Sequence, residues 1–178
     1  MRRPTLAVPA VLAALLALAA CARPESPPAP SSAPPSFREA GTLIGSTTRG
    51  GPSDLAGDWV VAQAFPGEPL AAPGARIAIP PGTRVGIGPG AGGATLWRFG
   101  EAPAIATTLA GPGRYRGEGV EIWVLWVDDD FRTMAVGTPD GRFGWIMDRA
   151  GAASPDRAAA AREMLDFNGY DLARLPPA

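Results

Sequence analysis

Three consecutive aspartates, Asp128, Asp129 and Asp130, are the residues of the sequence that most suggest chemistry. Two carboxyl groups this close can act as a general acid and a general base if burial raises the pKa of one of them. The cluster lies between two apolar runs, VEIWVLWV and FRTMAVGT, which predicts a tight turn exposed to water. Because such a turn supplies no desolvation, we interpret the aspartates as a device that ends one strand and starts the next, and not as a reaction centre.

The residue types that most catalytic and metal sites need are missing from the sequence. It contains no histidine and no lysine, and all 16 of its basic residues are arginines. Its single cysteine is Cys21. This composition excludes a conventional zinc site and a Ser-His-Asp or Cys-His device. We therefore predict a protein that is not an enzyme, with no catalytic residues, no metal ligands and no cofactor.

The first 20 residues have the layout of a secretory signal peptide. Arg2 and Arg3 begin it, the run LAVPAVLAALLALAA carries no charge, and LAAC ends it on small residues and a cysteine. Pro9 and the many alanines leave the run short and mildly hydrophobic for a transmembrane span of ~20 residues. Removal of Arg2 and Arg3 changes the formal net charge from -1 to -3. No basic patch remains, so nucleic acid is not an expected partner.

The segment LAAC resembles a bacterial lipobox, which implies cleavage before Cys21 and acylation of its sulfur and its new amine. The alternative is an ordinary cleavage site that happens to lie beside a cysteine. One acyl chain binds a membrane marginally, at ~0.8 kcal/mol per buried CH2, whereas two or more hold it firmly. The resemblance implies three chains. Ala22 stands where an aspartate would retain the protein at the inner membrane, so we expect an anchor in the outer membrane, at its periplasmic face.

A Pro- and Ser-rich segment, ARPESPPAPSSAPPS, follows the cysteine. It predicts an extended tether that reaches on the order of 40 Å at ~3.1 Å per residue. The residues after it, up to 53, are interpreted as a loosely ordered lead-in. The expected organisation is a signal peptide at 1–20, the lipidated cysteine and tether at 21–53, and one folded domain at 54–178.

Short strand-like segments make up most of this domain. Alternation in WVVAQAF places Trp59, Val61, Gln63 and Phe65 on one face of a first strand. Glycine and proline separate the segments that follow, a pattern that favours a sandwich or an up-and-down barrel. The further strands are expected at 75–80, 83–88, 94–99, 104–109, 113–117, 120–127, 131–138 and 142–149. The last three form an antiparallel meander, because DDD and TPDG are typical of tight turns.

One helix is expected after the meander, in SPDRAAAAREMLDF. Ser154 is a suitable N-cap, Pro155 fits the first helical position, and Asn168-Gly169 ends the helix. Its single apolar stripe predicts that it packs against the outside of the sheet.

Three blocks of the sequence resemble the lipocalin family, in the family's order. They are the G-x-W signature on the first strand, an acidic turn followed by an aromatic residue, and an arginine that ends the last strand before the helix. The residues that carry them are Gly57, Trp59, Asp128, Asp130, Phe131 and Arg149. With the lipobox, they are most similar to the bacterial outer-membrane lipoprotein type. The resemblance covers 57–65 and 120–172, whereas the Gly-, Ala- and Pro-rich strands between them depart from the family pattern.

The resemblance implies an all-β fold, an up-and-down antiparallel β-barrel that is complete or abbreviated, with one C-terminal α-helix packed outside. It also implies that Trp59 lies inside the barrel near its closed end. Arg149 would then pack across that indole, in a cation–π contact worth ~0.5 to 2 kcal/mol.

A lipocalin-like barrel implies a hydrophobic small-molecule or lipid partner, of the fatty acid or lysophospholipid class, and a membrane partner through the acyl chains. The candidate ligand-binding residues are Val61, Gln63, Phe65, Trp123, Leu125, Phe143 and Met147. On the later strands the facing direction stays open, because Val124 and Trp126 compete with Trp123 and Leu125. Gln63 is either a ligand contact or a satisfied core amide.

Two further alternatives stay open from the sequence. Arg114 and Arg116 either meet a lipid carboxylate or phosphate at the barrel mouth or are solvated. The protein itself could instead be an envelope lipoprotein that binds no ligand and serves as a structural or interaction module. The short strands rich in Gly, Ala and Pro between residues 75 and 117 favour that second function, because the cavity they enclose is expected to be small.

Overall fold

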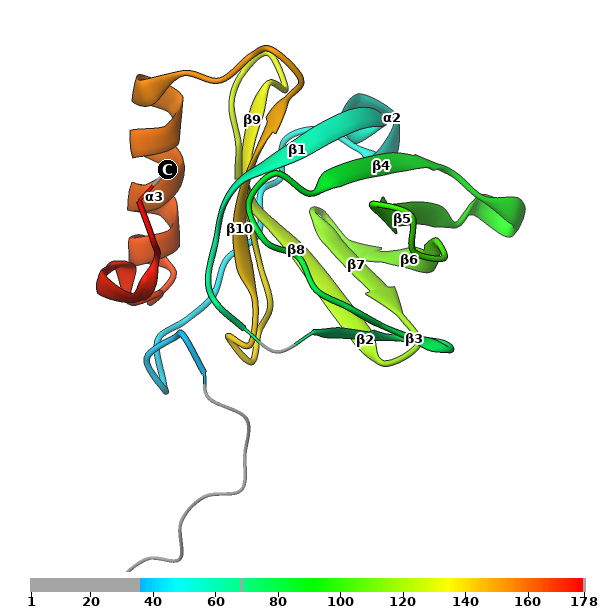
Figure 1. The fold of residues 1–178 in the computed structure, drawn as a ribbon, viewed down its shortest axis with the longest axis horizontal. Helices are drawn as coiled ribbons and strands as arrows, with labels where there is room; N and C mark the ends of the chain where they lie inside the picture. Colours follow the sequence, from blue (N-terminus) through cyan, green and yellow to red (C-terminus); the bar gives the residue numbers. More distant parts are fainter. Residues whose placement is uncertain (1–35, 68, 178) are drawn as a thin grey trace, which may run out of the picture. The chain divides into compact units, whose positions relative to one another are not determined.

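The computed structural model describes residues 36–67 and 69–177. In this part of the chain, eight antiparallel strands close into a barrel in the order β1-β10-β9-β8-β7-β6-β5-β4 (Figure 1). The predicted up-and-down barrel with one C-terminal helix is confirmed, and the barrel is closed rather than abbreviated. The expected signal peptide, Cys21 and most of the tether lie outside the described residues.

The strands of the barrel wall agree with the predicted segments to within a few residues. They are β1 (Gly57–Ala64), β4 (Arg84–Pro89), β5 (Thr95–Phe99), β6 (Ile105–Gly111), β7 (Arg114–Gly117), β8 (Val120–Val127), β9 (Thr133–Gly137) and β10 (Gly144–Arg149). The segment expected as a strand at 75–80 is different. Its first residues form β3 (Ala75–Ile77), which pairs with the unpredicted β2 (Leu70–Ala72) in a separate hairpin outside the barrel wall.

β1 closes the barrel because it pairs along both of its edges, with β4 on one side and β10 on the other. The register of β1 against β10 shifts between Val61 and Gln63, and that of β8 against β9 shifts between Val124 and Trp126. Each shift marks a β-bulge, an extra residue that reverses which face the following side chains occupy. Side-chain direction along these two strands therefore does not follow simple alternation.

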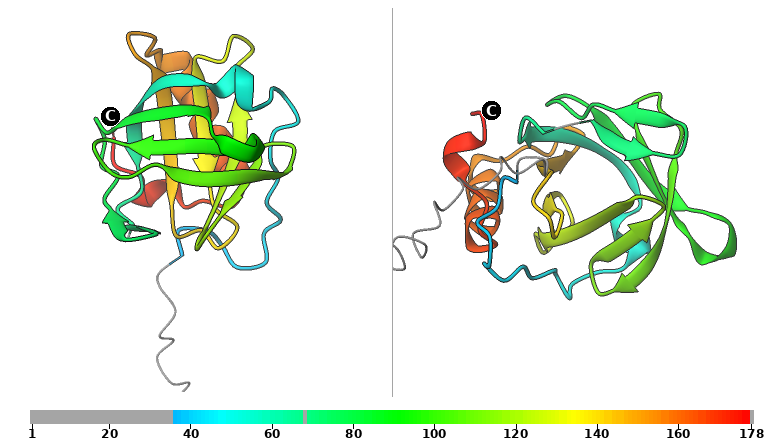
Figure 2. Two further views of the ribbon diagram at one scale, coloured as in Figure 1. Left: turned by 90° about the vertical axis from the view of Figure 1, so that its right-hand side faces the viewer. Right: turned by 90° about the horizontal axis from the view of Figure 1, so that it is seen from below.

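Hydrophobic clusters lie on both sides of the barrel wall. The interior cluster includes Trp59, Trp97 and Trp145, each at most 2% exposed. The outer cluster lies under the helix and includes Leu125, Ile146 and residues of the chain ends. The view from below in Figure 2 shows the helix outside the ring of strands. The wall is thus buried on both faces where the helix and the segments of the outer cluster cover it.

The helix itself, α3 (Pro155–Phe167), begins and ends as predicted. Ser154 caps it by accepting a hydrogen bond from the backbone N–H of Arg157, and Pro155 occupies the first turn. α3 packs against β8, β9 and β10. Three shorter helical segments were not expected, namely α2 (Pro52–Leu55), η2 (Ala91–Gly93) and η3 (Leu172–Arg174).

The segment before residue 54, expected to be a loose lead-in, packs along the barrel instead. Phe37 is only 3% exposed, and its backbone N–H donates to the Gly141 carbonyl at 2.7 Å. Further along, the Thr47 N–H donates to the Val124 carbonyl at 2.8 Å. The packed unit therefore begins N-terminal of the expected start, because this segment supplies apolar side chains to the outer cluster.

The buried Tyr170 hydroxyl connects the C-terminal segment to the β9–β10 turn through hydrogen bonds. Its removal should lower the free energy of unfolding. It accepts the Thr138 N–H at 2.8 Å and donates to the Phe143 carbonyl at 2.6 Å. Tyr170→Phe leaves a buried N–H unpaired, so we expect the free energy of unfolding in urea to fall by ~1 to 3 kcal/mol.

Tyr115→Phe is the matched control for this measurement. The Tyr115 ring is equally buried, but its hydroxyl forms no hydrogen bond within the described residues. Its removal should change the free energy of unfolding by no more than about 0.5 kcal/mol. Equal losses in the two variants would show that the Tyr170 hydrogen bonds do not account for the effect.

Candidate functional site

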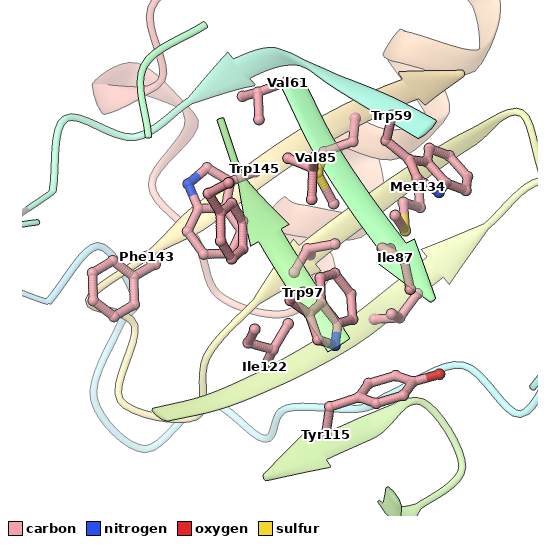
Figure 3. Close-up of a cluster of buried hydrophobic side chains, with 14 of the residues drawn as sticks. Trp59, Val61, Val85, Ile87, Trp97, Tyr115, Ile122, Met134, Phe143 and Trp145 are labelled. Atoms are coloured by element: carbon pink, nitrogen blue, oxygen red, sulfur yellow. The ribbon is translucent and has the colours of Figure 1, made fainter. Parts of the chain in front are cut away.

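The barrel interior is the candidate site, and aromatic rings cross it in continuous contact. Ring centroids lie 5.3 Å apart between Tyr115 and Trp97, 6.5 Å between Trp97 and Phe99, and 5.8 Å between Phe99 and Trp145. A further 5.8 Å contact joins Trp145 to Phe143 (Figure 3). The buried charged side chains of the described residues are Asp128 and Asp148, and both have polar partners outside this cluster, Asp128 with Arg132 and Arg157 and Asp148 with Thr133. The aromatic surface suits an apolar guest and would bind an ion poorly.

The β2–β3 hairpin fills one end of this interior. Leu70 and Ile77 on the hairpin are 1% and 6% exposed and belong to the interior cluster, and Ile79 packs against it. The cavity left between the hairpin and the rings of Phe143 and Trp145 measures about 20 Å³. That volume accommodates about one water molecule. In this conformation the side chains of the hairpin therefore leave little space at this end of the barrel.

Arg149 and Trp59 close the opposite end of the barrel. The Arg149 guanidinium lies 4.1 Å from the centre of the Trp59 ring, so the predicted packing is confirmed. It also donates to the carbonyls of Asp54, Ala56 and Phe131 at 3.0, 2.7 and 3.1 Å. Burial lowers the pKa of Arg149, but arginine remains charged.

The structure explains why the first position of the G-x-W block, at this end of the barrel, is a glycine. Gly57 has a φ of 113°, and a Cβ there would lie 2.6 Å from Nη1 of Arg149. Trp59 in turn donates its Nε1–H to the Leu55 carbonyl at 2.8 Å. These residues position one another, and they are structural as the resemblance implied.

Asp128 does not lie in water as the sequence analysis expected. It is 7% exposed, and its Oδ1 accepts the backbone N–H groups of Arg132 and Thr133 at 2.6 Å each. Burial alone would raise the pKa of Asp128. The hydrogen bonds from Thr133 and Arg132 and the charge of Arg157 outweigh that effect and hold it below its usual value of 3.8. The turn is thus closed by one buried carboxylate.

The other two aspartates of the cluster remain exposed and form surface ion pairs. Asp129 lies 2.5 Å from an Arg49 nitrogen, and Asp130 lies 2.6 Å from Arg132. A lowered pKa keeps Asp128 ionised, which does not suit a general acid. The cluster serves to shape the turn.

The β-bulge on β1 separates the candidates of that strand. Val61 points into the barrel with Trp59, whereas Gln63 and Phe65 lie beyond the bulge and face the helix side. The expectation that they line the interior is therefore wrong. The Gln63 amide accepts a hydrogen bond from Arg162 at 3.1 Å and donates to the Pro176 carbonyl at 3.4 Å, so it is a satisfied amide at the helix contact.

Phe65 packs between two other rings of the outer cluster. Its centroid lies 5.1 Å from that of Phe37 and 5.2 Å from that of Tyr170. It therefore joins the two chain ends to the barrel wall.

On β8 the inward-facing residues are Ile122 and Val124, so Trp123 and Leu125 are also misplaced in the candidate list. Leu125 packs under the helix. The Trp123 ring lies on the outside, 4.2 Å from the Arg114 guanidinium, and donates its Nε1–H to Glu121 at 2.9 Å. The surface offers the Trp123 indole both a cation, Arg114, and a hydrogen-bond acceptor, Glu121. This position is therefore more stable for the indole than an interior that lacks both groups.

The arginines considered for a lipid headgroup have protein partners. Arg114 stacks on Trp123 and donates to the Ser46 hydroxyl at 2.9 Å. Arg116 pairs with Glu121 at 3.1 Å. The remaining candidates, Met147 on β10 and Phe143 just before this strand, do belong to the interior cluster.

Several interior residues were missing from the candidate list, although one pattern indicates three of them. In TLWRF, Arg98 separates Trp97 from Phe99, so a solvated arginine would have placed both aromatics inside. Tyr115 lies between two arginines in the same way. Leu70 had no such signal, because it enters the interior from a hairpin outside the wall.

Some site types are not found in the described part of the chain. No helix there is long and apolar enough to cross a membrane. Those residues also contain no group of three or more His, Cys, Asp or Glu side chains placed to hold a metal ion.

Residues 114–178 match the family model of a lipocalin-like domain. The match begins at β7 and includes the acidic turn, Phe131, Arg149 and α3. No curated protein shows significant similarity to the chain. The matched segment is the part that carries two of the three blocks noted in the sequence.

Stability should respond to acid through Asp128. Its folded-state pKa lies below the unfolded value, so the stabilisation that its ionised form provides is present above pH ~4 and is lost as the pH falls through the folded pKa. Asp128→Asn should lower the free energy of unfolding at pH 7 by ~1 to 3 kcal/mol.

The difference between wild type and Asp128→Asn should shrink in urea titrations repeated below pH ~4. Asp130→Asn, which alters an exposed ion pair in the same turn, should cost less than ~1 kcal/mol at pH 7. A cost for Asp128→Asn that stays constant down to pH 2 would contradict the role of its charge.

Proposed function

Because the chain belongs to the lipocalin family, we propose that its barrel binds a small hydrophobic molecule. The lipocalin fold is generally a binding fold and not a catalytic one. The observation that carries the proposal is the run of contacting aromatic rings that crosses the barrel interior. Removing a guest from water into such a surface yields roughly 25 cal/mol for each Å² of apolar area.

The guest would enter where the β2–β3 hairpin covers the barrel. The strands of the hairpin pair with each other and form a sheet separate from the barrel wall. The hairpin can therefore move without breaking the strand pairing that closes the barrel. Displacement of Leu70 and Ile77 exposes the rings of Phe143 and Trp145 to a guest, which then replaces those aliphatic contacts.

A second candidate function is an interaction module that binds no small molecule. The observation that favours it is the filled interior, with a cavity of only about 20 Å³ below the hairpin. The two candidate functions predict different effects of shortening Leu70. Only a barrel that binds a small molecule should bind it more tightly when the additional space is present.

Titration with N-phenyl-1-naphthylamine, a neutral apolar fluorophore, separates the two candidates. We use the chain from Ala22 onward, which carries no acyl group, and expect its addition to increase the probe's fluorescence saturably. Leu70→Ala removes a side chain that the guest must displace, so the Kd should fall about tenfold.

Leu109→Ala is the matched control, because this leucine is 49% exposed and belongs to neither hydrophobic cluster. It should leave the Kd unchanged. If wild type and Leu70→Ala both fail to increase the fluorescence while remaining folded, the binding function is lost and the interaction module stands.

We further propose that acyl chains on Cys21 hold the protein at the periplasmic face of the outer membrane. The LAAC segment, the Pro- and Ser-rich residues after it and Ala22 support this location. An anchored barrel would meet apolar molecules that partition into the bilayer, which fits the proposed guest. Fatty acids and lysophospholipids are the classes that the family resemblance suggests.

Anchoring is tested by growth of cells that express the full-length chain with radiolabelled palmitate. Wild type should incorporate label and sediment with outer membranes, whereas Cys21→Ala should lose the label. Ala22→Asp should keep the label and move the protein to the inner membrane. Label that persists in Cys21→Ala would contradict acylation at this cysteine.

A further inference from the structure

Trp97 on β5 has an indole N–H without a hydrogen-bond acceptor. Among the described residues, its Nε1 is the one fully buried side-chain nitrogen or oxygen that has no partner. Trp59 and Trp123, in contrast, donate to the Leu55 carbonyl and to Glu121. A buried donor without an acceptor costs free energy, and an arriving oxygen would recover it. The polar edge of Trp97 is therefore a point of specificity in an interior whose other buried polar side chains on β5 and β6 are the threonines Thr95 and Thr107.

The neighbour of this N–H is the ring of Tyr115. The two rings meet edge to face with centroids 5.3 Å apart, and Figure 3 shows the Trp97 nitrogen on the side of Tyr115. An aromatic face accepts an N–H more weakly than an oxygen does. Burial, together with the charge of Asp54, raises the pKa of Tyr115 to about 12, so its hydroxyl stays neutral at physiological pH.

Among the described residues no arginine is buried, so the interior offers no buried cation to compensate a charged guest. Arg149 at the closed end already donates to three backbone carbonyls. A carboxylate or phosphate placed beside Trp97 would be desolvated without a counter-charge. The chemistry therefore favours an oxygen acceptor that carries no net charge.

We propose that the ligand of the barrel is a neutral apolar molecule with a carbonyl or ether oxygen, which accepts a hydrogen bond from Nε1–H of Trp97. This inference rests on the proposed binding function and specifies its ligand class. It departs from the fatty acid and lysophospholipid classes that the family resemblance suggests, because both of those carry charge.

A path for such a ligand leads from the hairpin to Trp97 along the interior rings. Trp97 contacts Phe99, and Phe99 contacts Trp145 beneath the hairpin. Met134 and Met147 are also fully buried in the interior, and their unbranched side chains can adapt to a guest. The guest thus places its apolar body along the rings and its oxygen at the inner end.

Three probes of one shape test the proposal by calorimetric titration of the chain from Ala22 onward. They are 2-acetylnaphthalene, which carries a carbonyl oxygen, 2-ethylnaphthalene, which carries none, and 2-naphthoate, which is anionic. Trp97→Phe keeps an aromatic ring and removes the N–H. It should weaken 2-acetylnaphthalene about fivefold relative to 2-ethylnaphthalene. 2-Naphthoate should bind the wild type most weakly of the three.

Trp145→Phe is the control, since it shortens another interior tryptophan and should weaken both neutral probes equally. If no probe binds the wild type, both the binding function and this inference are overturned. If the neutral probes bind but Trp97→Phe changes their affinities by the same factor, the inference alone fails. It also fails if 2-naphthoate binds as tightly as 2-acetylnaphthalene.

A nuclear magnetic resonance measurement on the wild type keeps the test independent of how Trp97→Phe folds. The indole N–H signal of Trp97 is assigned through its contacts with the Tyr115 ring protons. It should move downfield with 2-acetylnaphthalene and not with 2-ethylnaphthalene. Equal shifts with both probes would contradict the hydrogen bond.

Discussion

The closure of the barrel depends on the contact between Arg149 and Trp59. One guanidinium covers an indole face at 4.1 Å and satisfies three backbone carbonyls, from Asp54, Ala56 and Phe131. It thereby joins the end of β10, the turn before β9 and the chain that enters β1. A lysine offers one ammonium and no planar fork, so it could not satisfy the same set. The interior is closed at this end, and any guest must enter from the other.

Local signals in the sequence predicted much of the fold. The features that the sequence did not predict depend on contacts between residues far apart in the chain. Ser154 caps α3 with its side chain and Gly57 permits a φ that other residues avoid, and each acts within its own segment of the chain. The bulges on β1 and β8 depend instead on how those strands pair with β10 and β9. Alternation from Trp59 therefore placed Gln63 on the wrong face, whereas on β8 it left the choice between Trp123 and Val124 open. The same limit explains Asp128, whose environment requires Arg157 from the helix.

The candidate site was predicted least well, because its most distinctive residues lie in the Gly-rich middle of the chain. Short strands interrupted by glycine give a weak periodic signal, although Trp97 and Tyr115 each stand beside arginines that mark the outer face. Leu70 could not be assigned to the interior from periodicity, since it reaches the interior from a hairpin that is not part of the wall. Val61, Phe143 and Met147 were placed correctly, as they lie where alternation holds.

A filled barrel is compatible with binding because its contents are held in different ways. Side chains such as Trp97 project from strands that pair on both edges, so their backbone positions are fixed by the closed wall. Leu70 and Ile77 belong to a hairpin outside that wall, and their burial contributes roughly 1.5 to 3 kcal/mol each. A guest of similar apolar area offsets that loss when it replaces them. In the proposed binding mode, selectivity rests with the polar edge of Trp97, where an aliphatic side chain offers no acceptor.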